Sequence, residues 1–425
     1  MGQEDFVTRS GFTWLAAAIV VSGCAAEAVD GSGGADSVAL RLASEQTTEV
    51  RARDWPSFGA GARRAPIALR FQTLFAAPLV VEGLAADSRG QLYTAARGGD
   101  PCPVWRVDRG GGGALVVGSI PAPCSANGLA FDAAGRLYVA STDKIYRLEP
   151  NEAEPPSAAV FVSGLPGSNG LAFDASGTLW VSDGTSAQGR VWKVAPDAGV
   201  SVSFRVQPLA STLNVVEGSG GIGRDVRALP PGRLTITDTS RAAADTAGSQ
   251  PVVANGLAFA ADGSLFVSDT ARGAIWKVRF ADDGSVESSL GCDAAFPADT
   301  LCLEELFVAH PLLEGIDGIV LDRQGTLWGT AHERNALLRV TPQGKVHEVF
   351  RNPLDPSTLL RNGGPLEFPT TPVLLAGRLC LAHSDQNRRD NFPNSAGEVG
   401  PGLAGLGKIS CSNEPVVSTG LPQIH

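Results

Sequence analysis

The sequence has no excess of positive charge and no apolar run long enough to cross a membrane, and it lacks a Cys-x-x-Cys pair. Its 34 Lys and Arg residues are outnumbered by 44 Asp and Glu residues, which gives a formal net charge of −10. Nucleic-acid binding needs a basic face, so we expect no nucleic-acid partner. The absence of the Cys-x-x-Cys spacing argues against a thiolate metal site. Glycine, in contrast, is abundant, and much of it recurs in one motif.

This motif begins with a polar residue, Gly and an apolar residue. Four or five residues later come a second Gly, one further residue, and Leu followed by an aromatic residue. The copies are VEGLAADSRGQLYTAA from Val81, ANGLAFDAAGRLYVAS from Ala126, SNGLAFDASGTLWVSD from Ser168, ANGLAFAADGSLFVSD from Ala254 and IDGIVLDRQGTLWGTA from Ile316. Each copy alternates apolar positions around a tight turn, which predicts a β-hairpin. Third and fourth strands follow, such as KIYRLEP from Lys144 and AAVFVSGLP from Ala158. Successive early copies start at intervals in the forties, which is typical of propeller blades.

A degenerate sixth copy, TPVLLAGRLCLAHSD, begins at Thr371. We therefore predict an all-β fold, a six-bladed β-propeller of four-stranded antiparallel blades, over residues 65–425. Residues 206–252 are predicted to form an insertion between blades three and four on the face that holds the candidate site. The outer strand of blade six is left open, because IALRFQTLFAA from Ile67 and EPVVSTGLP from Glu414 both qualify.

The N-terminal residues have the features of an export signal. The apolar stretch 11–21 has the length of a signal core and is too short to span a membrane. It leads into Val21-Ser22-Gly23-Cys24, which resembles a bacterial lipobox. We predict a lipoprotein-type signal peptide at 1–23, a lipidated Cys24 and a flexible tether over 24–64. The protein would be exported and held to the bacterial cell envelope, periplasmic or at the cell surface, by this lipid alone. The alternative is a soluble signal peptide with an incidental Cys.

Six further cysteines agree with export, since an oxidising compartment favours disulfides. Local pairing suggests Cys102 with Cys124, Cys292 with Cys302, and Cys380 with Cys411. Spacing alone leaves the connectivity open.

The residue before the first Gly of each copy carries a side-chain oxygen. In a propeller this residue lies at the start of the innermost strand, so five blades aim five oxygens at one point. They are Glu82, Asn127, Asn169, Asn255 and Asp317. Mixed carboxylate and amide oxygens suit Ca²⁺, with Mg²⁺ and Mn²⁺ as alternatives. Asn-Gly and Asp-Gly also form plain turns. However, a turn has no use for Glu82, and five such residues in one register favour the metal.

Two of the five histidines, His332 in TAHERN and His383 in LAHSD, end second strands on the same face. Either histidine beside a metal could act as a general base. The alternative is a loop histidine that hydrogen-bonds a neighbouring backbone. Asp183 and Asp269, at matching positions, are expected to brace loops.

The hairpin motifs resemble those of the senescence-marker-protein (regucalcin) and gluconolactonase family of six-bladed propellers. The resemblance covers most of residues 65–425 and rests on the Glu-Gly-Leu, Asn-Gly-Leu and Asp-Gly-Ile sequences with their Asp-x-x-Gly-x-Leu-aromatic continuation. It implies a catalytic divalent metal, Ca²⁺, and hydrolysis of a small-molecule lactone or ester. The implied metal ligands are Glu82, Asn169, Asn255 and Asp317, with Asn127 as an added ligand or a substrate contact. It also implies that Asp317 activates water or attacks directly.

Two other functions stay open. One is a non-enzymatic, NHL-like binding propeller in which the metal only ties the blades together. The other is a propeller lyase that uses His332 or His383. In every case the segments 206–252 and 351–370 are expected on the site face as candidate lids.

Overall fold

The computed structural model describes residues 69–417 except 187, 209–249, 251, 289, 292–295, 358–360, 387–388 and 392–405. The predicted signal peptide, the lipidation site Cys24 and the tether lie outside the described residues. So do Cys292 and most of the predicted insertion at 206–252. No helix in the described part of the chain is long and apolar enough to span a membrane.

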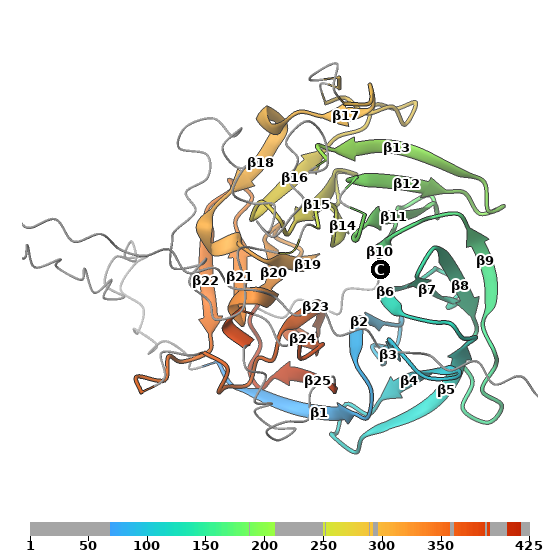
Figure 1. Cartoon of the computed structure of the whole chain (residues 1–425), viewed down its shortest axis with the longest axis vertical. Coiled ribbons are helices and arrows are strands. Elements are labelled where there is room, and N and C mark those ends of the chain that lie inside the picture. The colour runs from blue at the N-terminus through green and yellow to red at the C-terminus, as the bar shows by residue number, and fades with distance from the viewer. Residues whose placement is uncertain are drawn as a thin grey trace, which may run out of the picture. The chain divides into compact units, whose positions relative to one another are not determined.

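Six sheets stand around one axis, as Figure 1 shows, which confirms the predicted β-propeller. Blade one contains β2 (Val81–Ala86), β3 (Leu92–Ala96), β4 (Cys102–Val107) and β5 (Ala114–Ile120), and blade two contains β6 (Ala126–Phe131), β7 (Leu137–Ser141), β8 (Lys144–Leu148) and β9 (Ala159–Ser163). Blade three contains β10 (Ser168–Phe173), β11 (Leu179–Asp183), β12 (Arg190–Val194) and β13 (Val200–Val206), with the short β17 (Thr300–Leu301) parallel to β13. Blade four contains β14 (Leu257–Phe259), β15 (Leu265–Asp269), β16 (Ala274–Val278) and β18 (Leu306–Ala309). Blade five contains β19 (Ile316–Leu321), β20 (Leu327–Ala331), β21 (Ala336–Val340) and β22 (Val346–Arg351).

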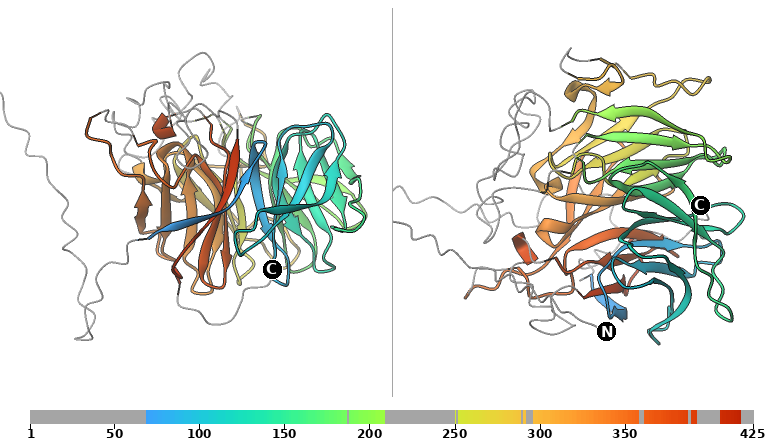
Figure 2. Two further views of the ribbon diagram at one scale, coloured as in Figure 1. Left: turned by 90° about the horizontal axis from the view of Figure 1, so that it is seen from below. Right: turned by 45° about the vertical axis from the view of Figure 1, so that its right-hand side comes forward.

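Blade six is assembled from both ends of the described chain: β23 (Pro369–Leu375), β24 (Arg378–His383), β25 (Gly407–Ser412) and β1 (Phe71–Ala77). β1 pairs antiparallel with β25 from Phe71 opposite Ser412 to Ala77 opposite Gly407 (Figures 1 and 2). Of the two candidate outer strands, the structure thus selects the one that begins near Ile67. The segment after Glu414 instead returns to the hairpin turn of blade six, where the Val416 N–H donates to the Gly377 carbonyl at 2.8 Å.

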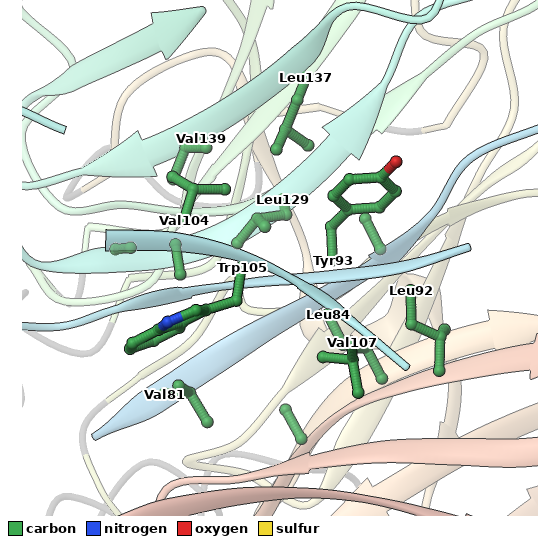
Figure 3. Close-up of a cluster of buried hydrophobic side chains, with 14 of the residues drawn as sticks. Val81, Leu84, Leu92, Tyr93, Val104, Trp105, Val107, Leu129, Leu137 and Val139 are labelled. Atoms are coloured by element: carbon green, nitrogen blue, oxygen red, sulfur yellow. The ribbon is translucent and has the colours of Figure 1, made fainter. Parts of the chain in front are cut away.

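The hydrophobic core lies between neighbouring blades. Figure 3 shows one such layer, where the side chains of Leu84 and Tyr93 from blade one face Leu129 and Val139 of blade two. The second strand of each blade has a neighbouring blade on both sides. Every residue of β3, β7, β11, β15 and β20 is therefore buried. This explains why these strands read as continuous runs of apolar and small residues.

The Asp-x-x-Gly sequence builds the turn between the first two strands. In blade three, Asp174 Oδ1 accepts the backbone N–H groups of Ser176 and Thr178, each at 2.9 Å, while Oδ2 accepts the Trp180 indole N–H at 2.9 Å. The same bonds recur at Asp87, Asp132 and Asp322 with the aromatic residues of their own hairpins. Burial alone would raise the pKa of Asp174, but these hydrogen bonds outweigh it and lower that pKa. The aspartates of this motif are therefore structural.

Candidate metal and catalytic site

The first strand of most blades contains a β-bulge at the motif. In blade one the pairing shifts between Val81 and Leu84, and in blade five between Ile316 and Ile319. The polar residue and its glycine lie within this irregularity. Bulges commonly re-aim side chains next to active sites. Here the bulge places the polar side chain at the start of the inner strand.

The glycines allow neighbouring inner strands to meet. A Cβ added to Gly83 would lie 2.0 Å from the Asn127 carbonyl oxygen, and one added to Gly170 would lie 2.3 Å from the Asn255 carbonyl oxygen. Gly128 and Gly256 are placed likewise against the next blade. Only glycine fits at such distances. The repeated glycine thus brings the five polar residues onto one ring.

Hydroxyl groups close this ring. Ser182 donates to the Asn255 carbonyl oxygen, and Ser268 to that of Asp317. Thr370 donates to the Glu82 carbonyl oxygen at 2.6 Å, which joins blade six to blade one. Thr370 is the sixth ring position and was missed in the sequence, because Thr371 stands where the other blades have glycine. The structure identifies this position, since Pro369 lies opposite His383 as Ile316 lies opposite Ala331.

The structure brings all five predicted metal ligands to the ring, where their residues are between 4% and 9% exposed. The Asn127 amide donates to the Ser168 carbonyl at 2.9 Å, and the Asn255 amide to Thr270 Oγ1 at 3.0 Å. Both amide oxygens therefore face away from these partners. Asn127 Oδ1 is buried and has no hydrogen-bond partner among the described residues. A buried carbonyl without a partner is costly, and a bound cation would satisfy it.

Asn169 is held against Gly184. A Cβ at that glycine would lie 2.2 Å from Asn169 Nδ2. Within the described ranges, no group of three or more His, Cys, Asp or Glu side chains could hold a metal. A metal at the ring would thus depend on its asparagine oxygens. The donor set of two carboxylates and three amides fits a hard divalent ion such as Ca²⁺.

The two ring carboxylates have different partners. Glu82 Oε2 forms an ion pair with Arg97 Nη1. Asp317 Oδ2 lies 2.9 Å from His332 Nδ1, which leaves Oδ1 for another ligand. Burial raises the pKa of Glu82 above its ordinary value; Arg97 and His332 oppose this rise, and Asp317 adds to it. These four groups therefore share one electrostatic environment.

His332 opens the 3-10 helix η4 (His332–Arg334) and is 3% exposed. A hydrogen bond from Nδ1–H to the Asp317 carboxylate assigns the tautomer and leaves Nε2 as the basic nitrogen. Nε2 has no hydrogen-bond partner in the described part of the chain and lies 3.9 Å from Glu333 Oε1. The ring of Phe368 stacks on the imidazole at a centroid distance of 4.2 Å.

Phe368 belongs to the predicted lid segment 351–370. Its N–H donates to Asn335 Oδ1 at 2.7 Å, and the nearby Asn352 amide donates to the Leu366 carbonyl at 2.7 Å. This segment thus places the Phe368 ring on His332. Sequence reasoning did not identify this contact, since no local pattern links Phe368 to His332.

His383 is arranged differently. Its Nδ1 accepts the Glu367 N–H at 3.1 Å, so Nε2 carries the proton and donates to Ser410 Oγ at 2.7 Å. The side chain is fully buried, and burial together with Lys408 lowers its pKa well below the ordinary value. Both nitrogens are engaged, Nδ1 by the segment that precedes β23 and Nε2 by β25, which favours a structural role.

Asp183 and Asp269 are buried and hold arginines. Asp183 Oδ2 accepts from Arg190 Nε at 2.8 Å, and Asp269 Oδ2 from Arg272 Nη1 at 2.7 Å. Arg272 also donates to the Gln207 carbonyl at 2.7 Å. On the far side of the predicted insertion, the Gln250 N–H donates to Glu333 Oε1 at 2.8 Å. Both described ends of that insertion therefore contact loops at the site face.

Two of the three proposed disulfides are confirmed. Cys102 bonds Cys124, and Cys380 bonds its cross-strand neighbour Cys411. The pairing of Cys302 with Cys292 falls partly outside the described residues. The two bonds indicate that the protein matures in an oxidising, extracytoplasmic compartment.

Comparison with protein families matches residues 127–366 to the SMP-30/Gluconolactonase/LRE-like region. The chain belongs to this family. Similar solved structures include a luciferin-regenerating enzyme at 13% identity, which covers 83% of this chain and 98% of that one with a TM-score of 0.51. A calcium-binding regucalcin from Agrobacterium tumefaciens is 16% identical over 84% of this chain and 98% of its own, with a TM-score of 0.49. A gluconolactonase from Xanthomonas campestris is 17% identical over 81% and 91%, with a TM-score of 0.44. Such identities show the fold alone, and no curated protein matches the chain.

Proposed function

We propose that this family member is a divalent-metal-dependent hydrolase of small lactones or related esters, with Ca²⁺ as the expected ion. The observation that carries this proposal is the ring of five side-chain oxygens, in which the buried Asn127 Oδ1 lacks a partner among the described residues. Glu82, Asn169, Asn255 and Asp317 would hold the ion. Asn127 would be a further ligand or a substrate contact.

The bound ion would supply Lewis-acid polarisation of the substrate carbonyl. Asp317 holds the His332 ring through Nδ1. Nε2 of His332 can then accept the proton of the attacking water, as a general base does. Phe368 stacks on the imidazole and limits its rotation. Direct attack by the Asp317 carboxylate is the alternative chemistry. His383 has no free nitrogen in this arrangement, and we assign it to packing.

The test is a Ca²⁺-dependent melting curve of wild type and Asp317→Ala, alongside a screen of lactones and aryl esters. Asp197→Ala, an exposed turn aspartate, is the matched control. We expect Ca²⁺ to raise the Tm of wild type and the control but not of Asp317→Ala, and hydrolysis to need both the ion and Asp317.

Stabilisation without turnover would favour a binding propeller with a structural ion. Ester cleavage that gives an alkene in place of the alcohol, lost on His332→Gln, would favour a lyase. If Ca²⁺ changes nothing, the ring is a set of turns and the proposal is wrong.

We also propose that the exported protein is lipid-anchored at Cys24. The disulfides support export, while the anchor remains a prediction from the lipobox. The intact mass of the mature protein, with Cys24→Ser as control, would reveal a diacylglycerol adduct or its absence.

A further inference from the structure

Arg97 holds a defined position beside the metal ring. It follows β3, and its backbone N–H donates to the Val80 carbonyl at 2.8 Å. Its guanidinium pairs with Glu82 and approaches Ser125 Oγ at 3.4 Å. The disulfide from Cys102 to Cys124 ties the loop after Arg97 to the segment that contains Ser125. The fold therefore anchors the backbone of Arg97 beside the ring, and the side chain that extends from it is 27% exposed.

The charges at the ring do not balance once a divalent ion is added. The ring carries two carboxylates, Glu82 and Asp317, and Arg97 neutralises the first of them in the structure. A divalent ion would by itself balance both carboxylates. Arg97 would then remain as a largely buried cation whose counter-ion is shared with the metal. Leaving a charge in such a place without a partner is strongly unfavourable.

We propose that the ligand of this site carries a carboxylate group, and that Arg97 binds this group once the metal has taken Glu82. The inference rests on the proposed function and specifies its substrate class: lactones or esters that bear a free carboxylate. The planar guanidinium can donate two parallel hydrogen bonds to a carboxylate. The exposed quarter of the side chain leaves room for it to turn from Glu82 to the ligand.

The first experiment is a calorimetric Ca²⁺ titration of the mature protein with and without propionate, with neutral propionamide as control. We expect propionate, and not propionamide, to tighten Ca²⁺ binding by about tenfold, since the propionate carboxylate balances the positive charge that Ca²⁺ adds to the site. Arg97→Gln should bind Ca²⁺ about tenfold more tightly than wild type without propionate, because the competing cation is gone. The propionate effect should vanish in Arg97→Gln and survive in part in Arg97→Lys. Arg106→Gln is the matched control, since Arg106 lies in the same blade, is 34% exposed and pairs with Glu152 instead.

The second experiment compares hydrolysis of 4-nitrophenyl hemisuccinate with that of 4-nitrophenyl acetate. The ratio of their kcat/KM values should fall by about tenfold or more in Arg97→Gln and stay at the wild-type value in Arg106→Gln.

The outcomes separate the two proposals. If Ca²⁺ affinity changes neither with propionate nor in Arg97→Gln, the anion site is wrong and the hydrolase proposal is unaffected. Calcium binding that responds to propionate through Arg97, with no ester or lactone turned over, supports the anion site and contradicts the hydrolase. Failure of wild type to bind Ca²⁺ would overturn both.

Discussion

At the scale of single residues, Gly170 shows how close the inner strands are. The position it faces, the Asn255 carbonyl oxygen, belongs to the next blade and to a predicted metal ligand. A side chain here would push the ring apart instead of merely crowding its own strand.

We expect Gly170→Ala to lower stability by about 1–3 kcal/mol, because the new Cβ would lie 2.3 Å from that oxygen and the strands would have to shift. Thermal unfolding measures this as a drop in Tm. Gly363→Ala is the control, since a Cβ there meets nothing within 4 Å. A wild-type Tm for Gly170→Ala would show that the inner strands are not in such close contact.

The second prediction at this scale concerns His383 and the pH dependence of stability. Its folded pKa is well below 6.5, so below that pH the unfolded chain binds a proton that the folded protein does not. Stability should therefore be complete at neutral pH and fall as the pH drops below 6.5, by at most about 1.4 kcal/mol for each pH unit.

The measurement is the Tm of wild type and His383→Gln at pH 7 and pH 5.5. The variant should be less stable at pH 7, through its lost packing, yet lose less on acidification. His347→Gln, which removes a partly exposed histidine of β22, should keep nearly the wild-type pH dependence. If Tm falls equally between pH 7 and pH 5.5 in wild type and in His383→Gln, His383 is not buried in its neutral form.

At the scale of elements, the unit that repeats is the hairpin with its capped turn. Asp174 satisfies two backbone N–H groups and one indole N–H at once, so it links the turn to the buried face of β11. Blade four departs from this scheme, since Ala260 takes the place of the aspartate and Phe266 that of the hydrogen-bonding aromatic residue. The aspartate and the aromatic hydrogen-bond donor are thus both missing from this blade, as expected if each is present as the hydrogen-bond partner of the other.

Asp174→Ala should therefore destabilise the protein by about 1–3 kcal/mol, since it strands the partly buried Trp180 indole N–H. Asp197→Ala removes an exposed turn aspartate with a single backbone bond to Gly199, and should cost less than about 0.5 kcal/mol. Urea unfolding of the two variants, monitored by tryptophan fluorescence, distinguishes them. Equal losses would mean that the indole bond contributes nothing.

At the scale of the whole molecule, the ring depends on β1. This strand completes blade six and also contacts both neighbouring blades, through Phe75 with Trp105 of blade one and Phe71 with Phe350 of blade five. It pairs with β25, so the two ends of the propeller hold each other (Figure 2).

We expect Leu74→Ala in β1 to lower stability by about 2–5 kcal/mol, because Leu74 is 5% exposed within the core shared with blade one. Gln72→Ala changes an exposed residue of the same strand and should leave the Tm within about a degree of wild type. Thermal melts of both variants test the closure. A small loss for Leu74→Ala would indicate that the ring is held without β1.

Much of this protein follows from its sequence, because its repeat is local. Alternation around each turn specifies a hairpin, the period specifies a blade, and the polar-Gly pair specifies where each blade meets the axis. Two disulfides could be proposed for the same reason, since each joins cysteines of one local region: Cys102 with Cys124, and Cys380 with its cross-strand neighbour Cys411. The repeat by itself therefore places the five oxygens on one ring.

The rest was decided by contacts between residues far apart in the chain. Two apolar segments were equally suited to be the outer strand of blade six, and only the register with β25 selected β1. Thr370 bonds Glu82 across 288 residues, and no glycine marks its place. The pairing of Arg97 with Glu82, and the stacking of Phe368 on His332, likewise arise when separate loops meet at one face. Sequence patterns report which way a residue faces within its own strand, whereas the partners across the ring depend on how the blades close.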